Sequence, residues 1–327
     1  MLLNNSELIA QQKATGFRAE ILEKVIMLID LLNAIYRDKF LRSRFVLKGG
    51  TALNLFYLDL PRMSVDIDLN YIGSVDPTVM RSEREEIDRM MGRIFLEKSM
   101  EVVRKPSNHA GGKYVLKYPS ALSYRGNLEF DINYMHRQLF QQAEIRNSIN
   151  IAGFETVFPV LNFSEIVAGK LCALFARDAS RDLFDVYQIV IQQGFDAKKM
   201  KTLFFIYGAM DSKKDWRTIS LEDINANQID LKNKLIPMLR RNEAKTLQSA
   251  RDLAKIYVET CREKLSPFFP LSKNEIAFYD HLKKGEVKPE LLSKDKDMIE
   301  KIKSHPAILF QAKKAQKNKK PGETNED

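Results

Sequence analysis

The sequence is poor in cysteine and histidine and has no long hydrophobic segment. Its 327 residues include two cysteines and four histidines, and neither cysteine belongs to a CxxC pair. This composition argues against a disulfide framework or a zinc site and fits a reducing cytoplasm. No run approaches the roughly 20 apolar residues of a membrane helix, and no basic segment followed by an apolar block opens the chain. We therefore expect a cytoplasmic protein without a membrane segment.

Basic residues outnumber acidic ones, and the formal net charge is +9. Such an excess favours polyanions through long-range attraction and counterion release, so RNA is a candidate partner. Many proteins that bind no nucleic acid are equally basic, and part of this excess lies in the lysine-rich C-terminal segment. The charge by itself leaves RNA binding open.

Periodicity along the chain predicts an α/β (α+β) fold, with a mixed sheet and flanking helices followed by a largely helical region. Helical spacing dominates the first 40 residues, and short alternating segments follow to about residue 133, interrupted by a charged helical stretch from Pro77 to about Met100. Beyond Pro159 the pattern is helical almost throughout. We place an α/β domain at residues 1–155, a helical domain at 156–310 and a disordered polar tail at 311–327.

Two carboxylates project from one face of a predicted strand. In SVDIDLNYI, Asp66 and Asp68 alternate with Val65, Ile67 and Leu69. Side chains at i and i+2 of a strand lie about 6 to 7 Å apart on the same face. Carboxylates held so close repel each other unless a cation lies between them, and hard oxygen ligands select Mg²⁺ or Mn²⁺. Most isolated DxD pairs are solvated surface residues, so the motif alone is weak.

A third acid lies on a second alternating segment, GNLEFDINY. Asp131 stands opposite Phe130 and Ile132 there, as the earlier acids stand opposite their apolar neighbours. If the two strands pair, three carboxylates converge, and such a set can hold two metal ions. Asp131 is equally explained as an ordinary polar-face residue beside Glu129.

A glycine pair stands between a predicted strand and a predicted helix. The segment FVLKGG indicates a short buried strand at residues 45–47, then Lys48, Gly49 and Gly50, with Thr51 as the helix N-cap. Main-chain N–H groups at such a junction form an anion site, and glycines let a phosphate approach closely. The spacing matches neither a P-loop nor a dinucleotide fingerprint, and many such turns bind nothing.

Four segments, taken in order, resemble one protein family: KGGTALNLFY, RMSVDIDL, LEFDINY and GKLCALFARDASRDLFDVY. Together, from about Phe45 to Ile189, they resemble the AbiEii/AbiGii nucleotidyltransferase toxins, relatives of the polymerase-beta-like fold that include the MenT toxins. The resemblance implies a nucleotidyltransferase-like sheet and an enzyme that moves a nucleoside monophosphate from an NTP to an acceptor hydroxyl. It also implies the toxin of a toxin–antitoxin or phage-defence system, with a cognate antitoxin.

The same resemblance implies roles for individual residues. Asp66, Asp68 and Asp131 would bind Mg²⁺ or Mn²⁺, and Lys170 would neutralise triphosphate charge. Helical spacing also places Arg177 within reach of the ligand of Lys170, but a solvated lattice of ion pairs explains the same pattern. The residues expected to bind the NTP are Lys48, Gly49, Gly50, Thr51, Arg62, Ser64, Arg177, Arg181, Asp182 and Asp185.

Two points stay open from the sequence. Either Asp182 or Asp185 would orient Lys170 or Arg181, and spacing does not decide between them. The resemblance suggests RNA, such as a tRNA 3′ end, as the acceptor. A protein side chain or a small molecule is the alternative acceptor, and an inactive scaffold that binds RNA or a protein is a further hypothesis.

Overall fold

The computed structural model describes residues 3–59, 61–108, 110–211, 214–241 and 250–318. The chain divides into two compact units, each continuous in space but not in sequence. Unit 1 comprises Met1–Ile166 and Asn227–Ala254, and unit 2 comprises Val167–Ala226 and Lys255–Asp327. This division differs from the sequence-based boundary after residue 155, because residues 227–254 return to the first unit.

Unit 1 contains a seven-stranded mixed sheet with the strand order β3-β4-β5-β2-β1-β7-β6. Strands β2 and β5 run parallel, as do β1 and β7, and the other neighbours are antiparallel. This mixed sheet with flanking helices is the predicted fold class. The strands are β1 (Phe45–Lys48), β2 (Asp66–Tyr71), β3 (Glu101–Arg104), β4 (Gly111–Tyr118), β5 (Gly126–Asn133), β6 (Glu144–Asn147) and β7 (Val157–Val160).

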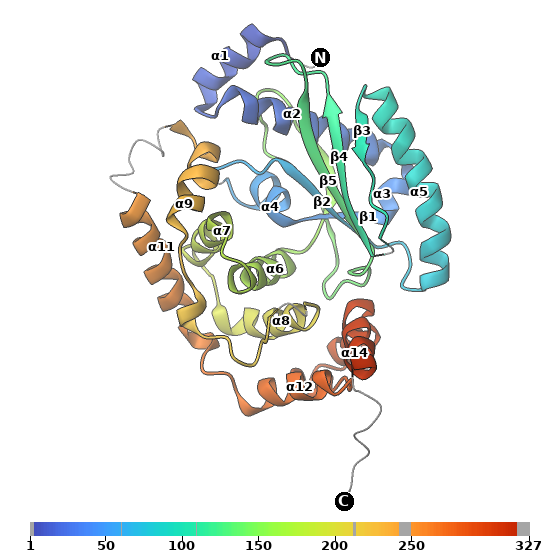
Figure 1. Cartoon of the computed structure of the whole chain (residues 1–327), viewed down its shortest axis with the longest axis vertical. Coiled ribbons are helices and arrows are strands. Elements are labelled where there is room, and N and C mark those ends of the chain that lie inside the picture. The colour runs from blue at the N-terminus through green and yellow to red at the C-terminus, as the bar shows by residue number, and fades with distance from the viewer. Residues whose placement is uncertain (1–2, 60, 109, 212–213, 242–249, 319–327) are drawn as a thin grey trace, which may run out of the picture. The chain divides into compact units, whose positions relative to one another are not determined.

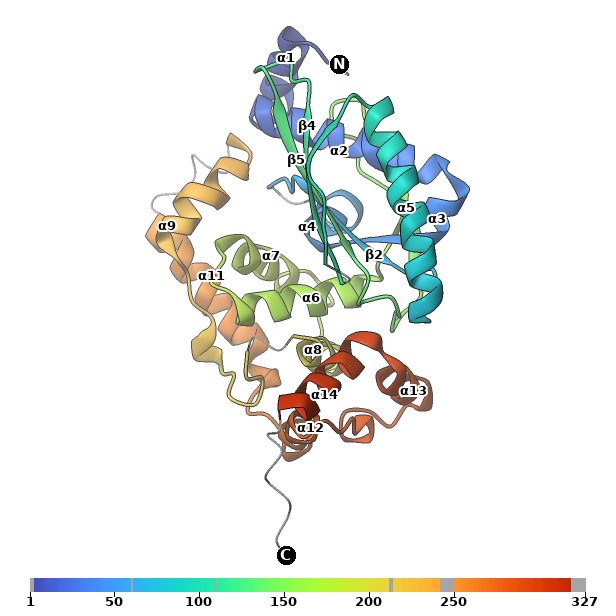
Figure 2. The same cartoon turned by 45° about the vertical axis from the view of Figure 1, so that its right-hand side comes forward.

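Helices cover the apolar face of the sheet, while α4 lies on the other face beside β1 and β2 (Figures 1 and 2). In the core, the ring of Phe130 on β5 lies 5.9 Å from that of Phe95 on α5 and 5.8 Å from that of Tyr114 on β4. Alternation along the strands therefore gives one face to the core and leaves the other for polar residues. The helices of unit 1 are α1 (Asn5–Thr15), α2 (Ala19–Arg37), α3 (Lys39–Arg44), α4 (Gly49–Ala52), α5 (Pro77–Glu97) and α9 (Gln228–Asp230).

Main-chain hydrogen bonds tie the returning segment 227–254 to unit 1. The N–H of Arg240 donates to the carbonyl of Pro61 at 2.8 Å, and the N–H of Arg241 donates to the carbonyl of Gly16, also at 2.8 Å. These partners are distant in sequence, so local periodicity could not predict that residues 227–254 pack against unit 1.

Unit 2 is helical and packs around aromatic rings. The ring of Phe204 lies 5.5 Å from that of Phe175, 5.2 Å from that of Phe268 and 5.7 Å from that of Trp216. Helices α12, α13 and α14 lie together in this unit (Figure 2). Both α6 and α11 begin in unit 1 and end in unit 2. The helices are α6 (Phe163–Ala176), α7 (Ser180–Val190), α8 (Ala197–Ala209), α11 (Ala250–Leu265), α12 (Lys273–Lys283), α13 (Lys296–Ser304) and α14 (Pro306–Asn318).

The predicted disordered tail from residue 311 is wrong for residues 311–318, which belong to helix α14. The helix continues to Asn318, and Ala307, Ile308 and Ala312 are buried along one side of it. This apolar stripe anchors the segment although the sequence around it is rich in lysine. The remainder of the predicted tail, 319–327, lies outside the described residues. No helix in the described ranges combines the length and apolar character needed to cross a membrane.

Candidate active site

Four charged side chains form a row across neighbouring strands of unit 1. Lys48 of β1 is the register partner of Asp68 of β2, Asp68 is the partner of Asp131 of β5, and Asp131 is the partner of Lys113 of β4. Neighbouring strands lie about 4.8 Å apart, and register partners share a face. The two aspartates therefore stand side by side with a lysine on each outer flank.

Asp66 adds a third carboxylate to the same face. It lies two residues before Asp68 on β2, and its register partner on β5 is Glu129. The opposite side of β2 carries Ile67 and Leu69, both fully buried. The three acids that the sequence analysis proposed as metal ligands therefore share one face of the sheet, because β2 and β5 pair directly in parallel.

Burial and repulsion both act on the central acid of this row. Asp131 is half-buried. Burial raises the pKa of its carboxyl above the usual range, the charge of Lys48 opposes that shift, and the charge of Asp68 adds to it. A cation bound between the two carboxylates would relieve this repulsion and favour the ionised form.

Lys113 belongs to this row, and the sequence analysis missed it. Its Nζ lies 2.5 Å from Oε2 of Glu129. This hydrogen bond is the main cause that raises the pKa of Lys113, and the charges of Asp66 and Asp131 add to it. Alternation in GGKYVLKY, where Tyr114 is buried, already placed Lys113 on a polar face, but only the strand order placed it beside Asp131.

The glycine pair lets the start of α4 lie directly against the acidic face. Gly49 has φ +74°, and a Cβ there would lie 2.5 Å from Oδ2 of Asp68. A Cβ on Gly50 would lie 2.8 Å from Oγ of Ser64 and 3.3 Å from Nη2 of Arg62. Side chains at both positions would therefore displace candidate site residues.

Thr51 and Arg62 are both buried next to this turn. The N-cap of α4 is Lys48, so the predicted N-cap role of Thr51 is wrong: the helix already begins at Gly49. The Thr51 hydroxyl donates to the main-chain oxygen of Asp66 at 2.5 Å. The guanidinium of Arg62, a residue only 2% exposed, donates to the carbonyl of Met63 at 3.0 Å.

In unit 2, the predicted lysine is enclosed by both candidate aspartates. Nζ of Lys170 lies 2.7 Å from Oδ2 of Asp185 and 3.3 Å from Oδ1 of Asp182. Asp182 also accepts hydrogen bonds from Nε and Nη2 of Arg177, at 2.5 and 3.1 Å. The side chains of Lys170, Asp182 and Asp185 are 10%, 4% and 0% exposed. The sequence left the choice between the two aspartates open, and in the structure both contact Lys170.

The burial of this cluster separates it from an ordinary lattice of surface ion pairs. Asp182 and Asp185 lie one helical turn apart on α7, and both turn inward to Lys170 on α6. Arg177 differs, because its side chain is 63% exposed. Arg181 is half-exposed on α7. Two cations and two carboxylates balance the charge of the cluster, and they fix the position of the Lys170 ammonium.

The carboxylates of unit 1 suit a hard divalent cation. Within the described ranges, no group of three or more His, Cys, Asp and Glu side chains has the mutual spacing of a metal site. Asp68 and Asp131 are nevertheless register partners on one face, with Asp66 two residues away on the same strand. Such oxygen donors match the preference of Mg²⁺ and Mn²⁺.

An acidic face on a mixed sheet, next to a glycine turn that opens a helix, agrees with the nucleotidyltransferase class that the sequence resemblance implies. A sequence model described as "Nucleotidyl transferase AbiEii toxin, Type IV TA system" matches residues 30–266. The chain therefore belongs to the AbiEii family of nucleotidyltransferase toxins of type IV toxin–antitoxin systems. Membership confirms the predicted family and enzyme class and implies an NTP substrate and an antitoxin partner.

A solved structure shows the same fold. The nucleotidyltransferase toxin MenT4 from Mycobacterium tuberculosis H37Rv is similar to this chain with a TM-score of 0.59 and 15% sequence identity, over 92% of this chain and 98% of that chain. At this identity the likeness concerns the fold alone. No curated protein sequence matches this chain.

Proposed function

We propose that this chain binds an NTP and a divalent cation on the acidic face of unit 1 and transfers a nucleoside monophosphate to an acceptor hydroxyl. The observation that carries the proposal is the register of Asp68 with Asp131 beside the Gly49 turn. Mg²⁺ or Mn²⁺ held by Asp66, Asp68 and Asp131 would polarise the α-phosphate and stabilise the leaving oxygen.

The residues of unit 1 would position the NTP and balance the charge of its phosphates. Main-chain N–H groups of Gly49 and Gly50, together with the Ser64 hydroxyl and the Lys48 ammonium, would contact the phosphates. Asp131 would accept the proton of the acceptor hydroxyl as its oxygen attacks the α-phosphorus in line. The acceptor O–Pα bond forms, the Pα–O–Pβ bond breaks, and pyrophosphate leaves with the displaced electron pair. Thr51 would act indirectly, because its hydroxyl ties α4 to the main chain of Asp66, and the Arg62 guanidinium would lie beside Gly50.

Lys170 would neutralise triphosphate charge in this reaction. Its contacts with Asp182 and Asp185 support the proposal, because an ammonium already held in place loses little freedom when it binds phosphate. Arg177 and Arg181 would add further phosphate contacts, since both keep part of their side chains exposed.

RNA, such as a tRNA 3′ end, is the acceptor that we propose, and the transfer would make the chain the toxin of a cytoplasmic toxin–antitoxin or phage-defence system. The net charge of +9 supports a polyanionic acceptor. Modification of a tRNA end would stop translation, which suits a toxin.

A transfer assay tests both the reaction and the acceptor. The full chain is incubated with Mg²⁺ and each α-labelled NTP in turn, together with total tRNA, total cell protein or an aminoglycoside. We expect label on tRNA only, and none on tRNA whose 3′ hydroxyl has been oxidised. Label on protein or on the aminoglycoside would identify the alternative acceptors.

The scaffold hypothesis makes a different prediction for Asp66→Ala. If the chain is an inactive RNA- or protein-binding module, this variant keeps any toxicity in cells. The proposed reaction predicts that toxicity is lost while the thermal unfolding of the purified variant stays close to that of the unaltered chain.

A further inference from the structure

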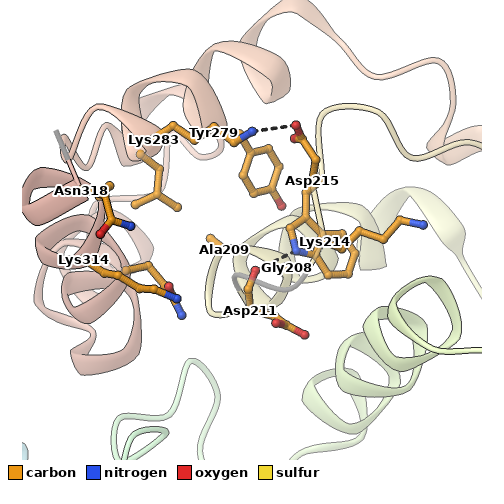
Figure 3. A pocket seen from close by; sticks show the side chains of 13 residues that line it. Gly208, Ala209, Asp211, Lys214, Asp215, Tyr279, Lys283, Lys314 and Asn318 are labelled. Carbon is orange, nitrogen blue, oxygen red and sulfur yellow. Dashed lines mark hydrogen bonds and ion pairs between the residues drawn. The ribbon is translucent and has the colours of Figure 1, made fainter. Parts of the chain in front are cut away.

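A cavity of about 240 Å³ lies in unit 2 between the end of α8, residues 214–216, α12 and α14 (Figure 3). Trp216, Tyr279, Leu282 and Ala315 form apolar walls. The volume is below the roughly 300 to 1,000 Å³ of sites for drug-sized ligands, so it suits a single ring system. None of the side chains proposed for catalysis lines this cavity.

The two aromatic walls are fixed in place. The Trp216 indole N–H donates to the carbonyl of Asp211 at 3.0 Å, and the Tyr279 hydroxyl donates to the carbonyl of Phe205 at 2.7 Å. A Cβ on Gly208 would lie 2.7 Å from the Tyr279 hydroxyl oxygen and 2.8 Å from the Trp216 ring. Because the polar atoms of both rings are satisfied inside the protein, the small part of each ring that lines the cavity is apolar.

The cavity is bordered by three lysines, two amides and two aspartates, and Lys214 and Lys283 are already paired with Asp223 and Asp215. Figure 3 shows Lys314 and Asn318 on α14 at one side, and Lys214 and Asp215 at the other. Asp215 adds little negative charge, since its carboxylate lies 2.7 Å from the Arg217 guanidinium and 2.6 Å from the Lys283 ammonium.

Helix α14 extends this basic rim beyond the cavity. Lys313 and Lys317 are exposed on the same helix as Lys314. An apolar slot beside a lysine-rich helix is a combination that proteins use for single-stranded nucleic acid: the base enters the slot and the phosphates follow the lysines.

We infer that this cavity binds one nucleobase of a single-stranded RNA, whose flanking phosphates lie along Lys314 and the neighbouring lysines of α14. The Asn318 amide, which can both donate and accept, would contact the polar edge of the base. The inference rests on the proposed function in one respect, because the bound RNA would be the acceptor. It gives unit 2 a surface for that acceptor.

Trp216 makes the inference directly measurable. It is the only tryptophan of the chain, and it lines the cavity, so its fluorescence reports on what enters. The full-length protein is titrated, without NTP, with a short single-stranded RNA, with an abasic chain of the same length and phosphate number, and with a free nucleoside monophosphate. We expect a saturable fluorescence change with the RNA, and much weaker responses to the abasic chain and the free nucleotide.

Matched variants separate the cavity from the general charge of α14. Ala315→Leu fills the slot without changing charge, and we expect it to weaken RNA binding about tenfold or more, the effect of losing one base contact. Lys314→Ala and Lys313→Ala remove the same charge from adjacent positions, but only Lys314 lines the cavity. We therefore expect Lys314→Ala to weaken binding more than Lys313→Ala does.

Three outcomes would overturn the inference: an equal response to the abasic chain, unaltered binding by Ala315→Leu in a folded protein, or equal losses for the two lysine variants. A response to the free nucleotide as strong as that to RNA would identify a nucleotide site instead.

Asp68→Asn should bind RNA as the unaltered chain does. If RNA binds at the cavity but receives no nucleotide, the proposed function fails alone; if tRNA is labelled but Ala315→Leu changes neither fluorescence nor KM for RNA, the inference fails alone.

Discussion

The acidic face of unit 1 and the Lys170 cluster of unit 2 differ in how their charged side chains are buried and paired. On the sheet, Asp68 and Asp131 stand side by side, and within the described ranges neither forms an ion pair. In the cluster, Lys170 lies within 3.3 Å of both Asp182 and Asp185. The first region therefore carries repulsion that a bound cation would remove, whereas the second is already neutral.

This difference separates a region built to bind a charged ligand from one built to hold a charged group still. Functional sites commonly retain interactions that lower stability, and the surrounding structure compensates. The comparison predicts different effects for the loss of one charge: loss of activity without loss of stability at Asp68, and loss of stability together with the proposed phosphate contact at Lys170.

The largest effect is expected for Asp68→Asn. Loss of one proposed metal ligand should lower nucleotide transfer about 10³-fold. The thermal unfolding midpoint should stay the same or rise, because the repulsion with Asp131 disappears. Glu129→Gln is the matched control: it lies on the same face but is paired with Lys113, and it should retain most activity. Full transfer by Asp68→Asn in the labelled-NTP assay would place the metal elsewhere.

Lys170→Met in unit 2 should lower the stability of the fold as well as nucleotide transfer. The change leaves Asp182 and Asp185 buried without their ammonium partner, and we expect a loss of about 3 kcal/mol in the free energy of unfolding, measured by urea denaturation. Arg177→Met provides the control, since an exposed ion pair contributes about 0 to 1 kcal/mol. Equal losses in the two variants would remove the distinction between a buried cluster and surface pairing.

Gly49→Ala sharpens the comparison within unit 1. The positive φ and the contact with Asp68 should together cost about 2 kcal/mol and displace the carboxylate, so transfer should fall as well. Gly153→Ala measures the cost of the positive φ alone, because Gly153 also has a positive φ but open space around its Cβ position. It should destabilise the protein less than Gly49→Ala does and leave nucleotide transfer unchanged. Equal activity losses would mean that the contact with Asp68 has no part in catalysis.

The smallest effect concerns a paired carboxylate of unit 1. Glu83 accepts two hydrogen bonds from Arg44, at 2.6 and 2.8 Å, and one from Tyr71 at 2.6 Å. The bond from Arg44 is the main cause that lowers the pKa of Glu83. At neutral pH, Glu83→Gln should reduce the free energy of unfolding by about 1 kcal/mol.

The pH dependence of this difference has a definite sign. Because the pKa of Glu83 is lower in the folded state, its stabilisation is complete above the unfolded-state pKa of about 4.3 and is lost as the pH falls through the folded value. Urea denaturation across this range should show the difference between Glu83→Gln and the unaltered chain shrinking on acidification. A difference that grows instead would contradict the assignment.

Local periodicity predicted the elements of unit 1 closely. The strand expected around the DxD pair is β2, and the helix expected from Pro77 to about Met100 is α5, which ends at Glu97. Such segments are recognisable because side chains alternate with period 2 in strands and with period 3.6 in helices. The same periodicity assigned Asp66, Asp68 and Asp131 to polar faces.

Local periodicity carries no information about contacts between segments that are distant in the sequence. The position of Lys113 beside Asp131 depends on β4 pairing with β5, and the return of residues 227–254 depends on hydrogen bonds to Gly16 and Pro61. The start of α4 was also misplaced. Threonine is a common N-cap residue, but the hydroxyl of Thr51 donates to the main-chain oxygen of Asp66.

By itself, the sequence determined which residues are acidic, which face of each strand they occupy and to which family the chain is similar, since these follow from residue type and local spacing. Only the tertiary structure decided that Asp68 and Asp131 are neighbours and that Lys170 is enclosed by two aspartates. Strand register and helix packing join residues far apart along the chain, and their free energy comes from burying whole faces against one another rather than from any local pattern.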